Sequence, residues 1–341
     1  MNRIFAITTR GLESISANEL SVLPSVKVDE IAYRRILASC QGSLAPLLSL
    51  RTVDDVFLHV GTWTGINRTR SALHTLREAS DQLQLNPALQ ACAEVRIIQI
   101  PPTFSITANF VGKRNYSTDE IKRACSAGII ERQGWSYSEN DANADLNLRI
   151  FIEGETAIVG IRLAAQSLSK RAYKQEHVPG SLKPAVAASL VSLANVNPNT
   201  QVLDPCCGAG TILIEAQLSG ATAYGGDSNQ KAVMAAHFNA AQAGTEVHIQ
   251  RWDAHALPIL ANSVDCVISN LPWGRTVTTD GSIQSIYQEL GKEIERVLTS
   301  SGSAVLLTNL PELVQFKRLK CDQQFEISLF GQTPTVTVWS D

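Results

Sequence analysis

The C-terminal half of the chain alternates short apolar runs with amphipathic segments. Helical spacing of apolar residues occurs at 184–194, 211–219, 230–242 and 286–298. Strand-like runs occur at 200–204, 223–227, 246–250, 264–270 and 303–309. Repeated strand–helix units predict an α/β fold with a doubly wound, mostly parallel sheet. Two final strand patterns, 325–330 and 335–340, have no helix between them and predict an antiparallel edge pair, which completes a seven-stranded sheet.

The N-terminal half mixes strand and helix patterns in a way that predicts an α+β structure. Strands are predicted at 3–8, 53–60, 94–100 and 104–111, and helices through 12–20 and 68–84. Ser117 and Glu120 have the spacing of a capping box and predict a helix within 113–134. Two alternating runs, 146–153 and 156–164, predict a hairpin that turns at Gly154.

A polar, basic stretch with two prolines and a glycine separates the two halves, and we interpret residues 166–180 as an interdomain linker. The 341 residues, 44% hydrophobic and 18% charged, suit two or three globular domains. The start of the chain resembles no export signal and no apolar run is long enough to span a bilayer, so we expect a cytoplasmic protein without a membrane partner.

The seven cysteines are scattered and the six histidines isolated, which disfavours disulfides and a metal site. The net charge of -3 divides unevenly along the chain. Residues 1–183 contain 21 Lys and Arg against 18 Asp and Glu, for a net charge of +3, whereas residues 184–341 carry -6. The basic half suits an anionic partner and the acidic half a cationic ligand.

An acidic residue stands at the end of each of three successive predicted strands. Asp204 precedes a turn through Gly208 and Gly210, and Asp227 and Asp253 end the next two strands. Carboxyl ends of parallel strands share one edge of a sheet, so these groups predict a nucleoside site where Asp227 accepts ribose hydroxyls and Asp253 an adenine amino group. A dinucleotide enzyme is disfavoured because the loop lacks the G-x-G-x-x-G spacing. The residues predicted to hold this ligand are Asp204, Cys206, Gly208, Ala209, Gly210, Asp227, Ser228, Asp253 and Ala254.

The strand at 264–270 ends in the sequence NLPWG, which resembles the motif of the amino-methyltransferases, and this resemblance implies chemistry on an exocyclic amine. The side-chain oxygen of Asn270 and the carbonyl of Leu271 can accept the two amine N–H groups, which directs the nitrogen lone pair at an electrophile. Pro272 stiffens the turn and Trp273 can stack on a base. Without the upstream acids, the same motif would fit an ordinary turn with a core tryptophan.

The chain resembles the THUMP-domain RNA methyltransferases, particularly the tRNA guanine-N2 methyltransferases. The resemblance rests on the segments 8–20, 110–124, 148–190, 204–216 and 269–275. It implies a ferredoxin-like domain at 1–65, a THUMP domain at 66–165, the linker at 166–180, and a class I (Rossmann-like) methyltransferase domain at 181–341 that uses S-adenosylmethionine. Gly180, Ser181 and Leu182 would lie over this cofactor, and Asn270 would contact it as well.

The implied reaction is methylation of the N2 amine of a tRNA guanosine, at position 6 of the acceptor stem, by a monomeric enzyme. The residues expected to contact RNA are Lys113, Arg114, Lys122, Arg123, Arg171, Lys174 and Arg275. The motif departs from the family pattern at Leu271, where proline is common, but a backbone carbonyl does not depend on that side chain. Ribosomal RNA, another tRNA guanosine, adenine N6 and a non-catalytic RNA-binding module stay open as alternatives.

Overall fold

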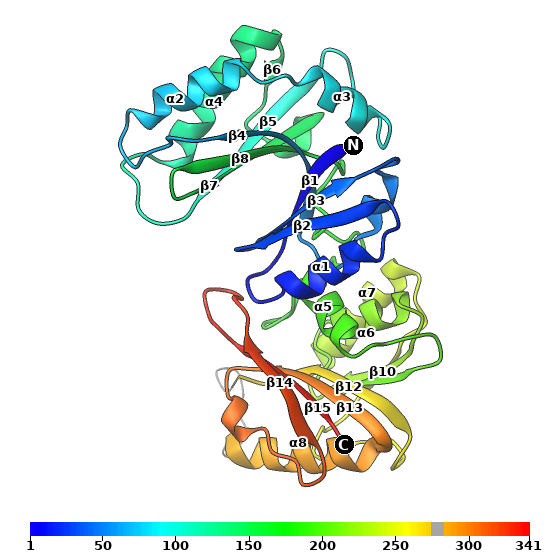
Figure 1. Cartoon of the computed structure of the whole chain (residues 1–341). Coiled ribbons are helices and arrows are strands. Elements are labelled where there is room, and N and C mark those ends of the chain that lie inside the picture. Colours follow the sequence, from blue (N-terminus) through cyan, green and yellow to red (C-terminus); the bar gives the residue numbers. More distant parts are fainter. Residues whose placement is uncertain (274–282) are drawn as a thin grey trace. The chain divides into compact units, whose positions relative to one another are not determined.

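The computed structural model describes residues 1–273 and 283–341, and the chain forms two compact units (Figure 1). The first contains residues 1–7 and 17–168, and the second contains residues 8–16 and 169–341. Within the described residues, no helix is both long and apolar enough to cross a membrane.

One eight-stranded sheet runs through the first unit. Its strands, in spatial order, are β2 (Val26–Ala32), β3 (Arg35–Cys40), β1 (Asn2–Ile7), β4 (Asp55–Trp63), β8 (Thr156–Arg162), β7 (Leu146–Glu153), β5 (Thr103–Phe110) and β6 (Ser136–Tyr137). The helices of this part of the chain are α1 (Glu13–Ser21), α2 (Ala72–Asp81), α3 (Asn86–Ala93) and α4 (Thr118–Gln133). Both predicted N-terminal domains, 1–65 and 66–165, contribute strands to this sheet, so the boundary between them stays a prediction.

Two local predictions for the first unit are confirmed. The capping box is formed, because the Ser117 hydroxyl accepts from the Glu120 N–H at 3.2 Å while the Glu120 carboxylate accepts from the Ser117 N–H at 2.9 Å. Strands β7 and β8 form an antiparallel hairpin that turns at Gly154, which has a φ of 58°. Both predictions are correct because each depends on local sequence. Ser117 and Glu120 satisfy N–H groups at the start of the helix, and Gly154 allows the left-handed backbone of the turn.

The strand predicted at 94–100 is wrong. These residues follow α3 as turns and irregular chain, with Ile97 97% exposed and Ile100 80% exposed. Alternation of apolar residues predicts a strand only where a sheet face receives them, and these side chains face water. The hairpin of β2 and β3 was not predicted, since most of β2 is exposed and carries little apolar pattern.

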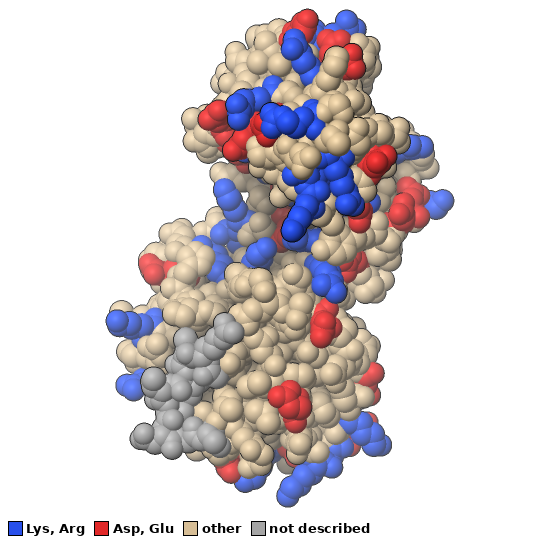
Figure 2. All heavy atoms as spheres, turned by 90° about the vertical axis from the view of Figure 1, so that its left-hand side faces the viewer, with Lys and Arg blue, Asp and Glu red and all other residues tan. Residues whose placement is uncertain are grey.

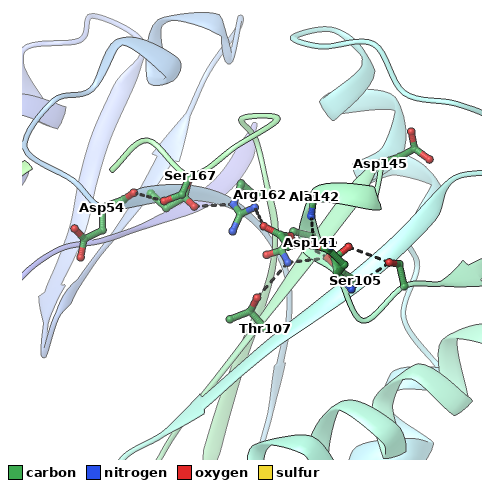
Figure 3. A network of polar contacts seen from close by, with 12 residues as sticks. Asp54, Ser105, Thr107, Asp141, Ala142, Asp145, Arg162 and Ser167 are labelled. Carbon is green, nitrogen blue, oxygen red and sulfur yellow. Dashed lines mark hydrogen bonds and ion pairs between the residues drawn. The ribbon is translucent and has the colours of Figure 1, made fainter. Parts of the chain in front are cut away.

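A buried ionic network lies on the sheet of the first unit (Figure 3). The Arg162 guanidinium donates to the Asp55 carboxylate at 2.7 Å and to the Asp141 carboxylate at 2.7 Å. Asp141 also accepts from the Ser105 hydroxyl at 3.0 Å. Arg162 is only 7% exposed and Asp55 5%, so the opposite charges compensate each other inside the protein.

The second unit contains the predicted seven-stranded sheet. Its spatial order is β11 (His248–Arg251), β10 (Thr222–Asp227), β9 (Gln201–Asp204), β12 (Val264–Asn270), β13 (Leu298–Thr308), β15 (Thr335–Ser340) and β14 (Lys320–Glu326). The first five strands are parallel, and β15 is antiparallel to both of its neighbours. The prediction of a doubly wound methyltransferase-type sheet with an antiparallel edge is therefore confirmed.

Helices cover both faces of this sheet. Helices α5 (Pro184–Leu193), α6 (Thr211–Leu218) and α7 (Gln230–Ala243) pack on one face, and α8 (Ile283–Val297) packs on the other (Figure 1). Neighbouring strand residues alternate accordingly: Val202 packs with the first group and Leu203 with α8. Strand β9 is thus buried on both sides, as its apolar composition predicted, whereas the edge strands β11 and β14 are largely exposed.

Two details of the second unit differ from prediction. Strand β14 ends at Glu326, not at residue 330, because the chain turns sharply between Leu329 and Gln332. Residues 8–16, assigned from sequence to the N-terminal domain, belong to the second unit. Leu12 and Ile15 are 0% and 7% exposed in its core. The burial of these apolar side chains, and not their place in the sequence, decides the unit to which the segment belongs.

Candidate functional site

One cavity of about 740 Å³ opens at the carboxyl edge of the second unit's sheet. Asp204 ends β9, Asp227 ends β10, Asp253 follows β11, and Asn270 ends β12, so four neighbouring strands deliver polar groups to the same edge. The predicted site residues on its wall are Gly180, Ser181, Leu182, Asp204, Cys206, Gly208, Ala209, Asp227, Ser228, Asp253, Ala254, Asn270, Leu271, Pro272 and Trp273. The predicted glycine turn and asparagine loop therefore share one cavity.

Asp204 ties the glycine turn to the strand that carries Asn270. Its Oδ1 atom accepts from the Ser269 hydroxyl at 2.7 Å and from the Cys206 N–H at 3.1 Å. Asp204 is 1% exposed, and this burial raises its pKa to about 7. The carboxylate therefore fixes the spacing between the two loops.

The other two acids retain acceptor capacity. The Asp227 carboxylate accepts from the N–H groups of Gly208 at 3.1 Å and Asn229 at 2.9 Å, one on each oxygen. A single oxygen of Asp253 accepts from the N–H of His255 at 3.0 Å and contacts its ring Nδ1 at 2.6 Å. The backbone hydrogen bond from His255 lowers the pKa of Asp253. Since a carboxylate has about four lone-pair positions, both groups can still bind a hydroxyl or an amine.

The two glycines of the turn have different roles. Gly208, with a φ of 51°, lines the cavity. Gly210 does not line it, contrary to the predicted ligand contact. Its φ is 76°, and a Cβ there would lie 3.0 Å from the Cβ of Ala236 on α7. Gly210 is therefore required by the close packing of α6 and α7.

Asn270 has one half of its amide paired and the other half unpaired. Its Nδ2 donates to the Gly180 carbonyl at 3.2 Å, which fixes the orientation of the side chain. Its Oδ1 is buried and has no hydrogen-bond partner among the described residues. Buried acceptors are normally paired, so this oxygen marks a place for a donor from a ligand.

The NLPW segment, residues 270–273, is held in place by Tyr287, which no sequence pattern had identified. The Tyr287 hydroxyl of α8 donates to the Pro272 carbonyl at 2.9 Å and contacts the Thr308 hydroxyl at 2.5 Å. Burial raises the pKa of Tyr287 to about 12, so it stays protonated as a donor. The indole Nε1 of Trp273 is buried without a partner among the described residues. Arg275, predicted to contact RNA, lies outside the described residues.

The segment 175–182, of which residues 178–182 line the cavity, is held by Asn239 of α7. Its Oδ1 accepts from the N–H groups of Gln175 at 3.1 Å and Glu176 at 2.9 Å. Its Nδ2 donates to the carbonyls of Glu176 at 2.9 Å and Ala209 at 3.1 Å. Asn239 is fully buried with both amide ends paired, so it joins this segment to the glycine turn.

Two basic residues of the predicted linker point into the protein. Lys174 donates to the Leu182 carbonyl and, at 3.0 Å, to the Thr211 hydroxyl, and burial lowers its pKa to about 8. Arg171 lies 3.7 Å from the fully buried Glu215 and is 13% exposed. The structure thus corrects the prediction that these two residues contact RNA. A buried acid on α6 draws them inward, which a polar, basic pattern could not reveal.

The predicted RNA contacts of the first unit differ in availability. Arg114 donates to the carbonyls of Ile66, at 3.0 Å, and Asn67, at 3.1 Å, and so has a structural role. Lys122 pairs with Asp119 at 3.0 Å. Lys113 and Arg123 are exposed, and neither forms an ion pair with a described residue. Lys113 and Arg123 are therefore the available cations of that group.

Several known proteins are similar to this chain. It is 30% identical over 211 residues to human U6 snRNA (guanine-N(2))-methyltransferase THUMPD2, covering 60% of this chain and 40% of that protein. It is 28% identical to the tRNA (guanine(6)-N2)-methyltransferase of Thermus thermophilus, covering 62% and 64%, and 24% identical to ribosomal RNA large subunit methyltransferase K/L of Photobacterium profundum, covering 96% and 51%. The chain thus spans between 40% and 64% of the length of these relatives.

The fold also matches solved structures. TrmN from Thermus thermophilus superposes with a TM-score of 0.81 at 24% identity, covering 100% of both chains. A methyltransferase complexed with SAH, SMU.472, superposes with a TM-score of 0.77 at 18% identity, covering 99% of this chain and 97% of that one. Residues 171–329 match the UPF0020 family, described as RMKL-like, methyltransferase domain. This match includes most of the residues that line the cavity, among them Asp204, Asp227 and Asn270.

Proposed function

We propose that this protein transfers a methyl group from S-adenosylmethionine to the exocyclic N2 amine of a guanosine in tRNA. The single observation that carries the proposal is the Asn270 side chain. Its Nδ2 is held by Gly180 and its buried Oδ1 has no partner among the described residues, in the same cavity as three acids. An acceptor fixed in this way suits an amine N–H that arrives with a substrate.

The acid-lined part of the cavity suits a cationic nucleoside. Among the described residues no Lys or Arg pairs with Asp204, Asp227 or Asp253, so the group favours a sulfonium ligand. The buried Ser181 hydroxyl has no partner there either, and the volume lies within the range of cofactor sites. A structural neighbour in complex with SAH supports this ligand class. When bound, S-adenosylmethionine would supply an electrophilic methyl group.

The residues that line the cavity would have separate roles in binding the cofactor and positioning the target amine. Asp227 would accept the ribose hydroxyls, and Asp253 with the Ala254 N–H would hold the adenine. Asn270 Oδ1 and the Leu271 carbonyl would accept the two N–H groups of the target amine, which directs its lone pair toward the methyl carbon. Trp273 would stack on the base. Positioning of this kind requires no separate general base, since water can take the proton that the amine loses.

The RNA assignment rests on the relatives and on the surface of the first unit. Two relatives cited above act by name on guanine N2, one in tRNA and one in U6 snRNA. Figure 2 shows Lys and Arg side chains, interspersed with acids, on one face of this unit. The ferredoxin-like domain at 1–65 and the THUMP domain at 66–165 stay proposals, as do a monomeric state and a cytoplasmic location. In this proposal, the first unit holds the tRNA through cations such as Lys113 and Arg123.

The test is incubation of the full chain with bulk tRNA and methyl-labelled S-adenosylmethionine, followed by nucleoside analysis. We expect label in N2-methylguanosine. Asn270→Ala should lower turnover roughly 10²-fold, because one fixed polar contact to the reacting group is lost. Asn270→Asp, which keeps an acceptor oxygen, should retain more activity. Label in N6-methyladenosine, transfer to ribosomal RNA alone, or no transfer to any RNA would each contradict the proposal.

A further inference from the structure

A two-residue turn between β14 and β15 carries an aromatic residue in a left-handed conformation (Figure 1). Leu329 and Gln332 exchange backbone hydrogen bonds, at 3.0 and 2.9 Å, across Phe330 and Gly331. Phe330 has a φ of 52° and Gly331 a φ of 74°. Positive φ at both central positions is the geometry of a type I′ hairpin turn.

Phenylalanine does not suit the first central position of such a turn. The position favours Asn, Asp or Gly, because a bulky side chain is strained at positive φ. The Phe330 ring is also 57% exposed, so burial gives it little compensation for that strain. Strain that brings no packing gain is a recurring mark of functional positions.

The turn lies on the wall of the same cavity, on the side away from the acids. Phe330 and Gln332 both line it. Thr335, at the start of β15, pairs with Thr308 at the carboxyl end of β13, which places the turn at the sheet edge where β12 presents Asn270. The acids belong to β9, β10 and the end of β11, on the opposite side of β12. Phe330 therefore borders the part of the cavity that the nucleoside acids leave open.

The backbone around Phe330 is firmly held. Ile327 and Leu329 are 1% and 2% exposed in the core of the second unit. The N–H of Ile327 donates to Pro334 at 2.9 Å, and that of Ser328 donates to the Arg10 carbonyl at 3.0 Å. The ring is thus presented at the cavity rim by a fixed turn.

We propose that Phe330 is a stacking residue for the base that is methylated, forming a second aromatic surface of the substrate site together with Trp273. The inference rests on the proposed function. Aromatic faces bind bases of any sequence, so Phe330 contributes to holding an unstacked purine, while Asn270 and the Leu271 carbonyl select its amine. Phe330 has no part in holding the cofactor.

The test compares Phe330→Asn, Phe330→Leu and Phe330→Tyr in the full chain. Phe330→Asn should raise the KM for tRNA about tenfold, the loss of one stacking contact, while the midpoint of thermal unfolding stays the same or rises because asparagine suits the turn. Phe330→Leu should raise the KM similarly, and Phe330→Tyr should restore tight binding. The control Leu260→Asn, which removes an apolar residue that is 80% exposed and away from the cavity, should keep the wild-type KM.

A second readout separates this inference from the proposed function. A short RNA containing 2-aminopurine, which loses fluorescence when it stacks, is titrated into wild type and Phe330→Asn with the cofactor bound. Quenching in wild type that is reduced in Phe330→Asn, in which Trp273 is still present, supports stacking on Phe330, even if no methyl transfer is found. A wild-type tRNA KM in an active Phe330→Asn enzyme overturns the inference while the proposed function stands. Weakened cofactor affinity in that variant, measured by calorimetry, also overturns it.

Discussion

The two units surround their buried acids, Asp55 in the first and Asp204 in the second, in opposite ways. In the first unit, Asp55 and Asp141 share the Arg162 guanidinium, each at 2.7 Å. In the second, Asp204 and Asp227 bind only N–H groups and a serine hydroxyl of the described residues. Uncompensated buried charge is costly to a fold. We therefore expect the first cluster to stabilise its unit and the second to bind a cationic ligand.

The largest effect that tests this comparison is expected for Arg162→Ala. Removing one partner of a buried ionic network leaves Asp55 and Asp141 unpaired, so the free energy of unfolding should fall by about 3–5 kcal/mol. Chemical denaturation of the full chain measures it. The control Arg132→Ala removes an exposed cation and should change stability by less than about 0.5 kcal/mol. A loss below about 1 kcal/mol for Arg162→Ala would show that the first cluster is not stabilising.

The next effect concerns the open cluster. Asp227→Ala should weaken S-adenosylmethionine binding by about 2 kcal/mol, or roughly 30-fold, because hydrogen bonds to a charged acceptor are lost. Calorimetry measures the dissociation constant, and Asp227→Asn, which keeps one acceptor, should lose less. Glu246→Ala removes an exposed acid away from the cavity and is the matched control. Equal affinity for the cofactor in Asp227→Ala and wild type would contradict the proposal that Asp227 accepts the ribose hydroxyls.

A smaller effect is expected for Tyr287→Phe, which deletes the hydroxyl that holds the Pro272 carbonyl. One neutral hydrogen bond is worth about 1 kcal/mol, so kcat should fall roughly fivefold while the KM for the cofactor stays near its wild-type value. Initial-rate kinetics separate the two constants. Tyr224→Phe, in a tyrosine that stacks on His248, is the control. A change in the KM for the cofactor alone would contradict the proposal that Tyr287 acts through the NLPW segment.

A separate test concerns the pH dependence of stability. Burial raises the pKa of Asp204 to about 7, above its unfolded value of 3.8, so the folded protein takes up a proton in this range. The contribution of Asp204 to stability is therefore complete below pH 4 and is lost as the pH rises toward 7. Asp204→Asn should flatten this part of the stability profile in thermal unfolding from pH 4 to 8. If wild type and Asp204→Asn showed parallel profiles of stability against pH, a group other than Asp204 would be responsible for the titration.

Much of the C-terminal unit could be predicted because its signals are local. Strands β9, β10 and β12 end in Asp204, Asp227 and Asn270, and parallel strands must present those ends at one edge of the sheet. The shared cavity of the glycine turn and the NLPW segment follows from that rule. The chemical roles of these residues are still proposals, which the variants above test.

Other parts of the site depend on contacts that no local pattern encodes. Asn239 forms a hydrogen bond with Glu176, which lies 63 residues away in the sequence. Tyr287 forms one with Pro272 only because α8 packs against β12. Arg171 and Lys174 carry the composition of a solvated linker, yet Glu215 draws them inside. Phe330 was assigned to a strand because its apolar side chain fitted the pattern, whereas the backbone hydrogen bonds of Leu329 and Gln332 place it in a turn.

Residues 8–16 leave the ribosome long before the unit to which they belong. Leu12 and Ile15 must stay exposed until residue 169 and those after it are synthesised, because their apolar partners are encoded there. A fragment that begins at residue 169 would lack both side chains and leave a gap in its core. We therefore expect that expression of the second unit alone requires residues 8–16 to be supplied, by fusion or as a separate peptide.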